Sequence, residues 1–359
     1  MTGSSLPPPP AGLEVATMGR VSVDLYPEQI GVTLAEVRSF AKSLGGSSTN
    51  VAVAAARLGR RSAAITKVGA DGFGPYVRQA LEDFRVYAGW VGTDPVLRTP
   101  VVFCEVHPPD HFPLLFYREP KAPDLNLGPD DFDGAAVASV PLFWTTGVGL
   151  TAEPSRTTTL EAMRSRAGTP HQPPPTRRGE DQKRGQPAPA WRGEAGWRAS
   201  GFTVHDLDYR PSLWTEPSEA RRWAREAVGL ASVVVGNLDE VEMATGTRDP
   251  EAAAAELLAL GPSLVIVKQG PKGVYARCGD ESVLVPPIPV ETLNGLGAGD
   301  AFGGAVCHGL LAGWELEPLI RFANAAGAIV ASRLACADAM PTRAEVDALL
   351  ASVPSPAAP

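Results

Sequence analysis

Short apolar runs alternate with amphipathic segments along most of this chain, and this alternation constrains the fold more than any other feature. The apolar runs predict strands, and the amphipathic segments between them predict helices. Their regular repetition predicts an α/β fold with a largely parallel central sheet and helices on both faces. The expected strands include 64–68, 142–145, 202–206, 232–236 and 264–267, and the expected helices include 48–58, 154–163, 219–228 and 250–260.

Two further predicted strands break this alternation because no helix separates them. Residues 99–106 and 114–117 are apolar runs joined by a proline-rich turn. With a strand at 21–26 they predict a small separate sheet, whose lid strands occupy about 20–30 and 99–118. In an α/β protein such a sheet often covers the ligand site. The alternative is an ordinary hairpin on the main sheet.

Three polar segments are predicted to lie outside the folded core. Residues 165–199 are rich in proline and charge and have almost no aliphatic side chains, so we expect a disordered polar insert there. A basic recognition tail is the alternative. The composition of 1–12 and 351–359 predicts disordered tails. One domain at 13–350 remains.

Charge and residue spacing argue against several classes of protein. The net charge is −8 and no basic stretch is sustained outside the insert, which argues against nucleic acid as a partner. The four cysteines and five histidines form no metal-ligand spacing, so a transition-metal site is not expected and a reducing compartment is favoured. Without a long apolar run or a signal-peptide pattern, we expect no membrane association and a cytoplasmic location.

The segment 294–304, Asn-Gly-Leu-Gly-Ala-Gly-Asp-Ala-Phe-Gly-Gly, carries the strongest indication of chemistry. Gly297, Ala298 and Gly299 would let backbone N–H groups approach an anion at the start of a predicted helix. Asp300 in the first turn would lie beside a bound phosphate and accept a proton from an attacking hydroxyl. The alternative is a tight turn in which Asp300 only complements the helix dipole.

A second glycine pair precedes an alanine-rich helix. Gly45 and Gly46 would let a polyhydroxylated ligand lie against the backbone, and Asn50 offers both a donor and an acceptor. A structural turn is the alternative here.

Together, Gly-Gly…Asn before an alanine-rich helix and Gly-Ala-Gly-Asp about 250 residues later resemble the ribokinase (PfkB) family of carbohydrate kinases. The resemblance covers roughly 15–350 apart from the insert. It implies a ribokinase-like fold with a β-sheet lid over the sugar, and ATP and Mg²⁺ as cofactors. It also implies that Gly297, Ala298 and Gly299 form an anion hole beside the catalytic base Asp300.

The same resemblance assigns roles to residues elsewhere in the chain. It implies that Asp24, Gly46 and Asn50 contact the sugar, and that Asn237 and Glu240, in an Asn-x-x-Glu motif, help to organise Mg²⁺ and phosphate. The residues that it places against the nucleotide are Lys268, Gly270, Gly273 and Asn324.

One position departs from the family pattern. Many members have an aspartate three residues before Gly-Ala-Gly-Asp, where it helps some of them to hold K⁺. This chain has Asn294, which carries no charge. The resemblance allows K⁺ as a cofactor, whereas Asn294 argues against a K⁺ requirement.

Two arginines narrow the expected substrate. Arg118 lies in the predicted lid, and Arg210 lies in a segment similar to the Asp-x-Asn-x-Arg of keto-deoxy sugar acid kinases. A guanidinium can bind both oxygens of a carboxylate, although a surface ion pair is the alternative for each. The stretches 19–27, 117–125 and 290–300 resemble bacterial 5-dehydro-2-deoxygluconokinases of inositol catabolism, which implies phosphorylation of C6 of 5-dehydro-2-deoxy-D-gluconate.

Other functions remain open at this stage. Within enzymes, the alternatives are a 2-keto-3-deoxygluconate kinase and a fructokinase-like sugar kinase. From another class, a non-catalytic sugar-acid binding protein would keep the fold. The lid edges also allow a homodimer.

Overall fold

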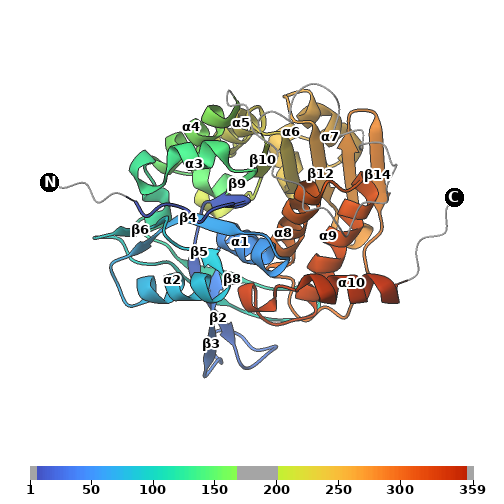
Figure 1. Ribbon diagram of the computed structural model, residues 1–359. Coiled ribbons are helices and arrows are strands. Elements are labelled where there is room, and N and C mark those ends of the chain that lie inside the picture. Colours follow the sequence, from blue (N-terminus) through green and yellow to red (C-terminus); the bar gives the residue numbers. More distant parts are fainter. Residues whose placement is uncertain (1–5, 168–200, 354–359) are drawn as a thin grey trace.

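A computed structural model of the protein describes residues 6–167 and 201–353. At its centre lies a ten-stranded sheet (Figure 1). The strand order is β14-β13-β12-β11-β10-β9-β1-β4-β5, with β6 paired to β4. All neighbours are parallel except β13 and β14, which are antiparallel at one edge. The strands of this sheet are β1 (Val15–Met18), β4 (Ser62–Gly69), β5 (Val86–Tyr87), β6 (Val91–Asp94), β9 (Leu142–Thr146), β10 (Phe202–Asp206), β11 (Val233–Asn237), β12 (Leu264–Lys268), β13 (Val274–Cys278) and β14 (Glu281–Val285).

Helices cover both faces of the sheet and form two hydrophobic cores (Figure 1). Helices α1, α2, α8, α9 and α10 pack on one face, and α3 to α7 pack on the other. Their bounds are α1 (Ser47–Arg57), α2 (Phe73–Asp83), α3 (Gly134–Ser139), α4 (Ser155–Ala167), α5 (Pro217–Val228), α6 (Leu238–Thr245), α7 (Pro250–Leu258), α8 (Ala298–Ala312), α9 (Leu316–Ala331) and α10 (Arg343–Ser352).

Strand β12 shows why several strands of the sheet are apolar along most of their length. Leu264 and Ile266 belong to one core, whereas Val265 and Val267 belong to the other. Successive side chains of a strand point to opposite faces, so a strand covered on both sides favours apolar residues at successive positions. The predicted α/β fold with helices on both faces is confirmed.

A second sheet of four strands has the order β3-β2-β7-β8 and projects from the main body (Figure 1). Its strands are β2 (Ser22–Pro27), β3 (Phe40–Gly45), β7 (Val101–Cys104) and β8 (Leu114–Tyr117). The structure thus has a separate small sheet and not a hairpin on the main sheet. Strand β3 was not predicted, because its first three side chains are partly or fully exposed and its sequence is mixed.

The start of the predicted insert is wrong by three residues. Helix α4 continues to Ala167, and Arg166 is buried within the fold. Its guanidinium donates to the carbonyls of Val140 and Phe202, at 2.9 and 3.0 Å, and to the hydroxyl of Thr203 at 3.0 Å. These bonds tie the end of α4 to β10. The rest of the predicted insert, 168–199, lies outside the described residues.

The predicted tails are also shorter than expected where the structure describes them. The Tyr87 hydroxyl donates to the carbonyls of Pro7 and Pro8, at 2.7 and 3.1 Å. At the other end, α10 extends to Ser352. Residues 1–5 and 354–359 lie outside the description. In the ranges that the structure covers, no helix is both long and apolar enough to cross a bilayer.

The burial of Arg166 leads to a prediction about stability. We expect Arg166→Met to lower the free energy of unfolding by roughly 2–4 kcal/mol, because buried carbonyls would lose charged donors. Urea denaturation followed by circular dichroism measures this change. Arg164→Met is the matched control, because Arg164 lies on the same helix, is 49% exposed and pairs with Glu226. That control should cost less than about 1 kcal/mol, and equal losses would contradict the structural role of Arg166.

Candidate active site

A cavity of about 270 Å³ lies where three neighbouring parallel strands end. Asp206, Asn237 and Lys268 are the last residues of β10, β11 and β12, and all three side chains line the cavity. Ligands of open α/β sheets bind outside the carboxyl ends of the strands, so the topology itself creates the site. The lid covers it with side chains from β2, β7 and β8, namely Ser22, Asp24, Tyr26, Val102, Leu114 and Phe116.

Most of the predicted site residues meet in this cavity although they are far apart in the sequence. Those that line it are Asp24, Gly46, Asn50, Arg210, Asn237, Glu240, Lys268, Gly297, Gly299 and Asp300. Gly45 and Ala298 are adjacent in the chain to lining residues. Gly45 lies so close to the Asp24 carboxyl group that an added Cβ would overlap it.

Arg118 has a different place from the one expected. It is buried and makes a two-pronged ion pair with Asp124, with N–O distances of 2.7 and 3.2 Å. Asp124, in the 3₁₀ turn Pro123–Asn126, also accepts the backbone N–H of Val21 at 3.0 Å. Arg118 does not line the cavity. This pair joins the end of β8 to the start of β2, so its role here is architectural and not the surface ion pair considered as the alternative.

Three of the residues predicted to contact the nucleotide lie beyond the cavity. Gly270 and Gly273 flank the turn after β12, and Gly273 has a φ of +89° and packs against the end of β14. Asn324 on α9 donates to the Pro286 carbonyl at 3.1 Å. Gly273 also approaches Pro286, so these positions meet beside the open end of β14.

The start of helix α8 forms one wall of the cavity. Gly297 caps it with a φ of +81°, and the first intrahelical bond runs from the N–H of Ala301 to the Gly297 carbonyl at 2.9 Å. The preceding N–H groups have no intrahelical acceptor, as at any helix start. With the helix dipole, these N–H groups create a place that suits a phosphate.

Asp300 is held in the first turn of this helix. The Asn50 side-chain amide donates to its carboxylate at 2.8 Å, which joins α1 to α8. Burial raises the pKa of Asp300 to about 7, although the bond from Asn50 opposes this shift. The other polar atom of Asn50, Oδ1, is buried and has no partner among the described residues. A carboxyl group with this pKa can accept a proton near neutral pH.

The lid contributes a second buried acid. Asp24 accepts a hydrogen bond from the Ser22 hydroxyl at 2.6 Å, and burial raises the pKa of Asp24 to about 6. Asp24 lies against Gly45, and both Asp24 and Gly46 line the cavity. A carboxylate and glycine backbone therefore border the same part of the cavity. Such a combination suits the hydroxyl groups of a sugar.

Lys268 offsets part of the negative charge of the nearby carboxylates, which include Asp206 and Glu240. Burial raises the pKa of Glu240 to about 7 and also raises the pKa of Asp206. Burial disfavours the charge of Lys268, but the surrounding carboxylates, Asp206 first among them, raise its pKa above the ordinary value. The Glu240 carboxylate also accepts the N–H of Asn237 at 2.7 Å, within a capping box at the start of α6.

Asp208 lies between two arginines, Arg20 and Arg210, and all three residues line the cavity. Its carboxylate lies 3.1 Å from a terminal nitrogen of Arg210 and 3.9 Å from Nε of Arg20. Burial alone would raise the pKa of Asp208, but Arg210 and Arg20 hold it below the usual range. Asp208 therefore stays ionised, and the two cations share one anion.

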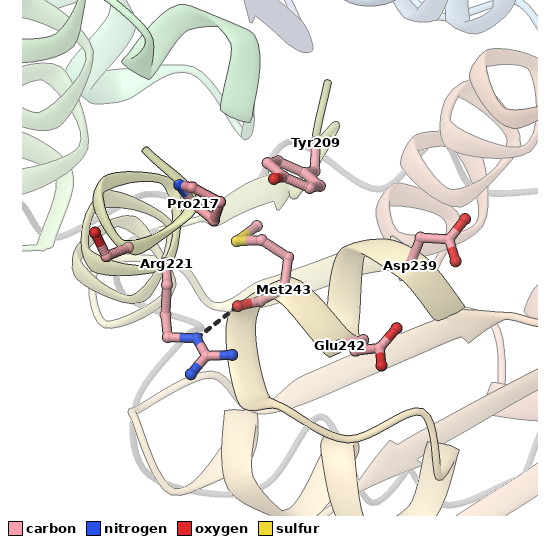
Figure 2. Close-up of a pocket in the computed structure, with 7 residues that line it drawn as sticks. Tyr209, Pro217, Arg221, Asp239, Glu242 and Met243 are labelled. Carbon is pink, nitrogen blue, oxygen red and sulfur yellow. Dashed lines mark hydrogen bonds between the residues drawn. The ribbon is translucent and has the colours of Figure 1, made fainter. Parts of the chain in front are cut away.

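The residue between Asp208 and Arg210 points elsewhere. Figure 2 shows Tyr209 directed into a separate hollow between α5 and α6, together with Met243 and Arg221. Arg221 donates there to the Met243 carbonyl at 2.8 Å. Because successive side chains diverge, Asp208 and Arg210 both face the cavity while Tyr209 does not.

The fold and this site together define a class of protein. Such proteins bind a small ligand in a cavity under a β-sheet lid, and here Asp300 and the start of α8 form one wall of that cavity. The family model described as pfkB family carbohydrate kinase matches residues 13–170 and 197–343. The chain therefore belongs to the PfkB family and is an ATP-dependent carbohydrate kinase.

Three relatives illustrate the similarity. The 5-dehydro-2-deoxygluconokinase of Photobacterium profundum is 33% identical over 338 residues, which are 92% of each chain. The fructokinase of Vibrio cholerae O395, bound to fructose, ADP and potassium, is 26% identical with a TM-score of 0.76, covering 94% of this chain and 98% of that one. A Pyrococcus horikoshii sugar kinase in complex with ATP is 26% identical with a TM-score of 0.71, covering 93% and 99%.

Several cavity residues were missed from the sequence. Asp206 ends a predicted strand, so its position at a carboxyl end could have identified it. Arg20 directly precedes the lid strand that carries Asp24, but nothing local indicates that it turns inward. Cys336 lines the cavity beside Tyr26, whose hydroxyl lies 2.7 Å from its sulfur. No motif connects residues 310 positions apart.

The close approach at Gly297 generates a prediction. An added Cβ would lie 2.8 Å from the Cys336 sulfur and would need a φ of +81°. We expect Gly297→Ala to lower the free energy of unfolding by more than the roughly 1–2 kcal/mol that a positive φ alone costs. Gly59→Ala is the matched control, because Gly59 has a φ of +89° and open space around it. Equal losses in urea denaturation would mean that the Cys336 contact is unimportant.

Proposed function

We propose that the protein transfers the γ-phosphoryl group of ATP to the C6 hydroxyl of 5-dehydro-2-deoxy-D-gluconate, a reaction of myo-inositol catabolism. The observation that carries this proposal is the meeting of Asp300, the α8 start and two arginines in one cavity. The curated relatives with this activity, such as that of Photobacterium profundum, support the choice of substrate.

Asp300 acts as the general base. Its carboxylate accepts the proton of the C6 hydroxyl as that oxygen forms a bond to the γ-phosphorus. The bond from the γ-phosphorus to the bridging oxygen breaks, and ADP leaves with the electron pair. The hydrogen bond from Asn50 keeps one carboxylate oxygen in place, so the other can face the hydroxyl.

The phosphate end is prepared by backbone and by charge. Gly297, Ala298 and Gly299 supply N–H groups that stabilise the negative charge of the migrating group. The amino group of Lys268 lies beside Gly299, because a Cβ atom added to Gly299 would be 3.5 Å from the Lys268 Nζ. Lys268 therefore adds a positive charge close to these N–H groups. Asn237 and Glu240, which line the cavity, would hold Mg²⁺, and the bound ion would neutralise phosphate charge.

The nucleotide and the sugar have separate supports. We assign the nucleotide base to the region of Gly270, Gly273 and Asn324, where the loops around Pro286 meet. We assign the sugar hydroxyls to Asp24, Gly46 and Asn50, whose unpartnered Oδ1 can accept a hydroxyl donor. Arg210 is assigned to the carboxylate of the substrate.

A fructokinase-like activity is the second candidate, because the fructose-bound Vibrio cholerae enzyme has the same fold. A neutral sugar brings no anion to the two arginines, which then have to share the single carboxylate of Asp208, so the acid is favoured.

The proposal extends to the setting of the enzyme. We propose a cytoplasmic location and a homodimer in which the lid edges pair across a two-fold axis. Strand β8 ends the lid sheet, and Leu115 and Tyr117 on it are exposed. We also propose that the side chain of Asn294 does not hold K⁺, because its amide nitrogen donates to the Leu334 carbonyl and its oxygen accepts the N–H of Leu296.

Replacing the base should separate turnover from binding. We expect Asp300→Asn to lower kcat by roughly 10²- to 10⁴-fold, because the hydroxyl loses its proton acceptor. Binding of the sugar acid and of an ATP analogue, measured by calorimetry, should change little. Asp239→Asn is the control, since Asp239 is an exposed acid of the neighbouring hollow (Figure 2).

The pH profile of the same enzyme checks this role. The pKa of Asp300 is raised to about 7, so below that pH the carboxyl is protonated and cannot accept a proton. The value of kcat/KM should then fall about tenfold for each pH unit. A flat profile down to about pH 5, or near-normal turnover of Asp300→Asn, would contradict the assignment.

The substrate proposal is tested by comparing 5-dehydro-2-deoxy-D-gluconate, 2-keto-3-deoxygluconate and D-fructose at one ATP concentration. We expect kcat/KM to be highest for the first. Arg210→Ala should raise KM for the acids by at least about tenfold and KM for fructose by much less, because only the acids use the guanidinium. Equal effects on acids and fructose would remove Arg210 from the carboxylate site.

A further inference from the structure

We propose that Arg20 is the second guanidinium that binds the substrate carboxylate, opposite Arg210, in the place that the sequence had suggested for Arg118. This inference rests on the proposed function, because it concerns how a sugar acid is recognised in the same cavity. It starts from the three arginines near the lid, which the structure places very differently.

Arg118 already has a buried anionic partner, and its Nε is buried without a hydrogen-bond partner among the described residues. Both of its terminal nitrogens bond to Asp124, and the pair is almost completely buried. A carboxylate ligand would have to displace Asp124, which would then remain buried without a partner. That exchange is costly, because an uncompensated buried charge destabilises a protein by several kcal/mol.

Arg20 has the opposite arrangement. Its side chain is only 9% exposed, yet it lines the cavity. Its Nε donates to the Ser47 hydroxyl at 3.4 Å, and its guanidinium carbon lies 5.8 Å from the centre of the Phe116 ring. The two terminal amino groups have no hydrogen-bond partner in the ranges that the structure describes. Arg20 is thus held by one edge, and its other edge is available to a ligand.

Asp208 positions both arginines. It accepts the Ser47 hydroxyl at 2.7 Å and lies within 4 Å of Arg20 and of Arg210. Its backbone has a φ of 30°, in the left-handed region that a non-glycine residue enters only when its surroundings require it. Such strain is common at functional sites.

The charges at this wall leave room for one more anion. Arg20 and Arg210 carry two positive charges, and Asp208 supplies a single negative charge between them. One carboxylate from the substrate would complete the balance. Asp24 and Asp300 also act on Arg20, but burial raises the pKa values of these two carboxyl groups to about 6 and 7, so with a neutral sugar they compensate its charge only in part. The wall therefore selects for a sugar acid.

Direct binding tests this inference without relying on turnover. Calorimetry would give the Kd of 5-dehydro-2-deoxy-D-gluconate and of AMP-PCP with Mg²⁺ for the wild type, Arg20→Met and Arg118→Lys. We expect Arg20→Met to weaken binding of the acid by roughly 10- to 100-fold, as the loss of a charged hydrogen-bonding partner implies. The nucleotide analogue should bind all three proteins within about threefold of one another, and Arg118→Lys should bind the acid normally.

The possible outcomes separate the two proposals. If the wild type fails to bind the acid but binds AMP-PCP, the proposed substrate is wrong. If the wild type binds the acid and Arg20→Met binds it equally well, the assignment of Arg20 is overturned. A loss in Arg118→Lys as large as that in Arg20→Met would also overturn it.

A second measurement tests Asp208 as a positioning residue. Asp208→Asn should weaken binding of the acid by about tenfold in the wild type, but by less than about threefold when Arg20→Met and Arg210→Met are already present. This non-additivity is expected because Asp208 acts through the arginines. Equal losses in both backgrounds would mean that Asp208 supports only the fold.

Discussion

The hydrogen bond from Asn50 to Asp300 is the interaction on which the rest of the site depends. It connects α1, which follows the glycine pair on the sugar side, to α8, which begins at the phosphate side. The two helices can approach closely because Gly304 faces Ala54, where an added Cβ would overlap. The acceptor and donor ends of the reaction are therefore held at a set spacing by one polar contact and a small-residue packing surface.

Burial is what gives the acids of this cavity their chemical character. Burial between the lid and the sheet reduces the contact of these groups with water, and it raises the pKa values of Asp24, Glu240 and Asp300 to about 6, 7 and 7. The same burial strengthens each charge interaction with a bound phosphate or carboxylate. Lys268 and the arginines offset part of the negative charge, so the cavity can accept anionic ligands despite five carboxylates on its walls.

Much of the architecture could be predicted because it follows from local patterns. Strands such as β11 and β12 are apolar along most of their length, as expected for strands that are covered on both faces. Gly297 and Asp300 could be recognised because a helix start and its neighbouring acid are contiguous in the chain. The lid was predicted from the absence of a helix between two apolar runs.

The remaining features depend on contacts between distant segments. The sequence near Arg118 and Arg20 does not show which guanidinium turns toward the cavity, because that choice is made by Asp124 and Asp208. The end of the helix at Arg166 was misplaced because a charged residue normally indicates exposure, whereas here backbone carbonyls surround it. Strand β3 is held by its pairing to β2, which no local pattern reveals.

The sealed pair of Arg118 and Asp124 has an evolutionary consequence. Because one arginine maintains the lid and another lines the pocket, substitutions that alter ligand preference need not weaken the scaffold. Lineages of this enzyme could change toward uncharged sugars by substitutions at positions 20 and 210, while the connection between the end of β8 and the start of β2 stays intact. Because Arg118 has a structural role and Arg20 lines the cavity, residues that contact the ligand can change without loss of the Arg118–Asp124 pair.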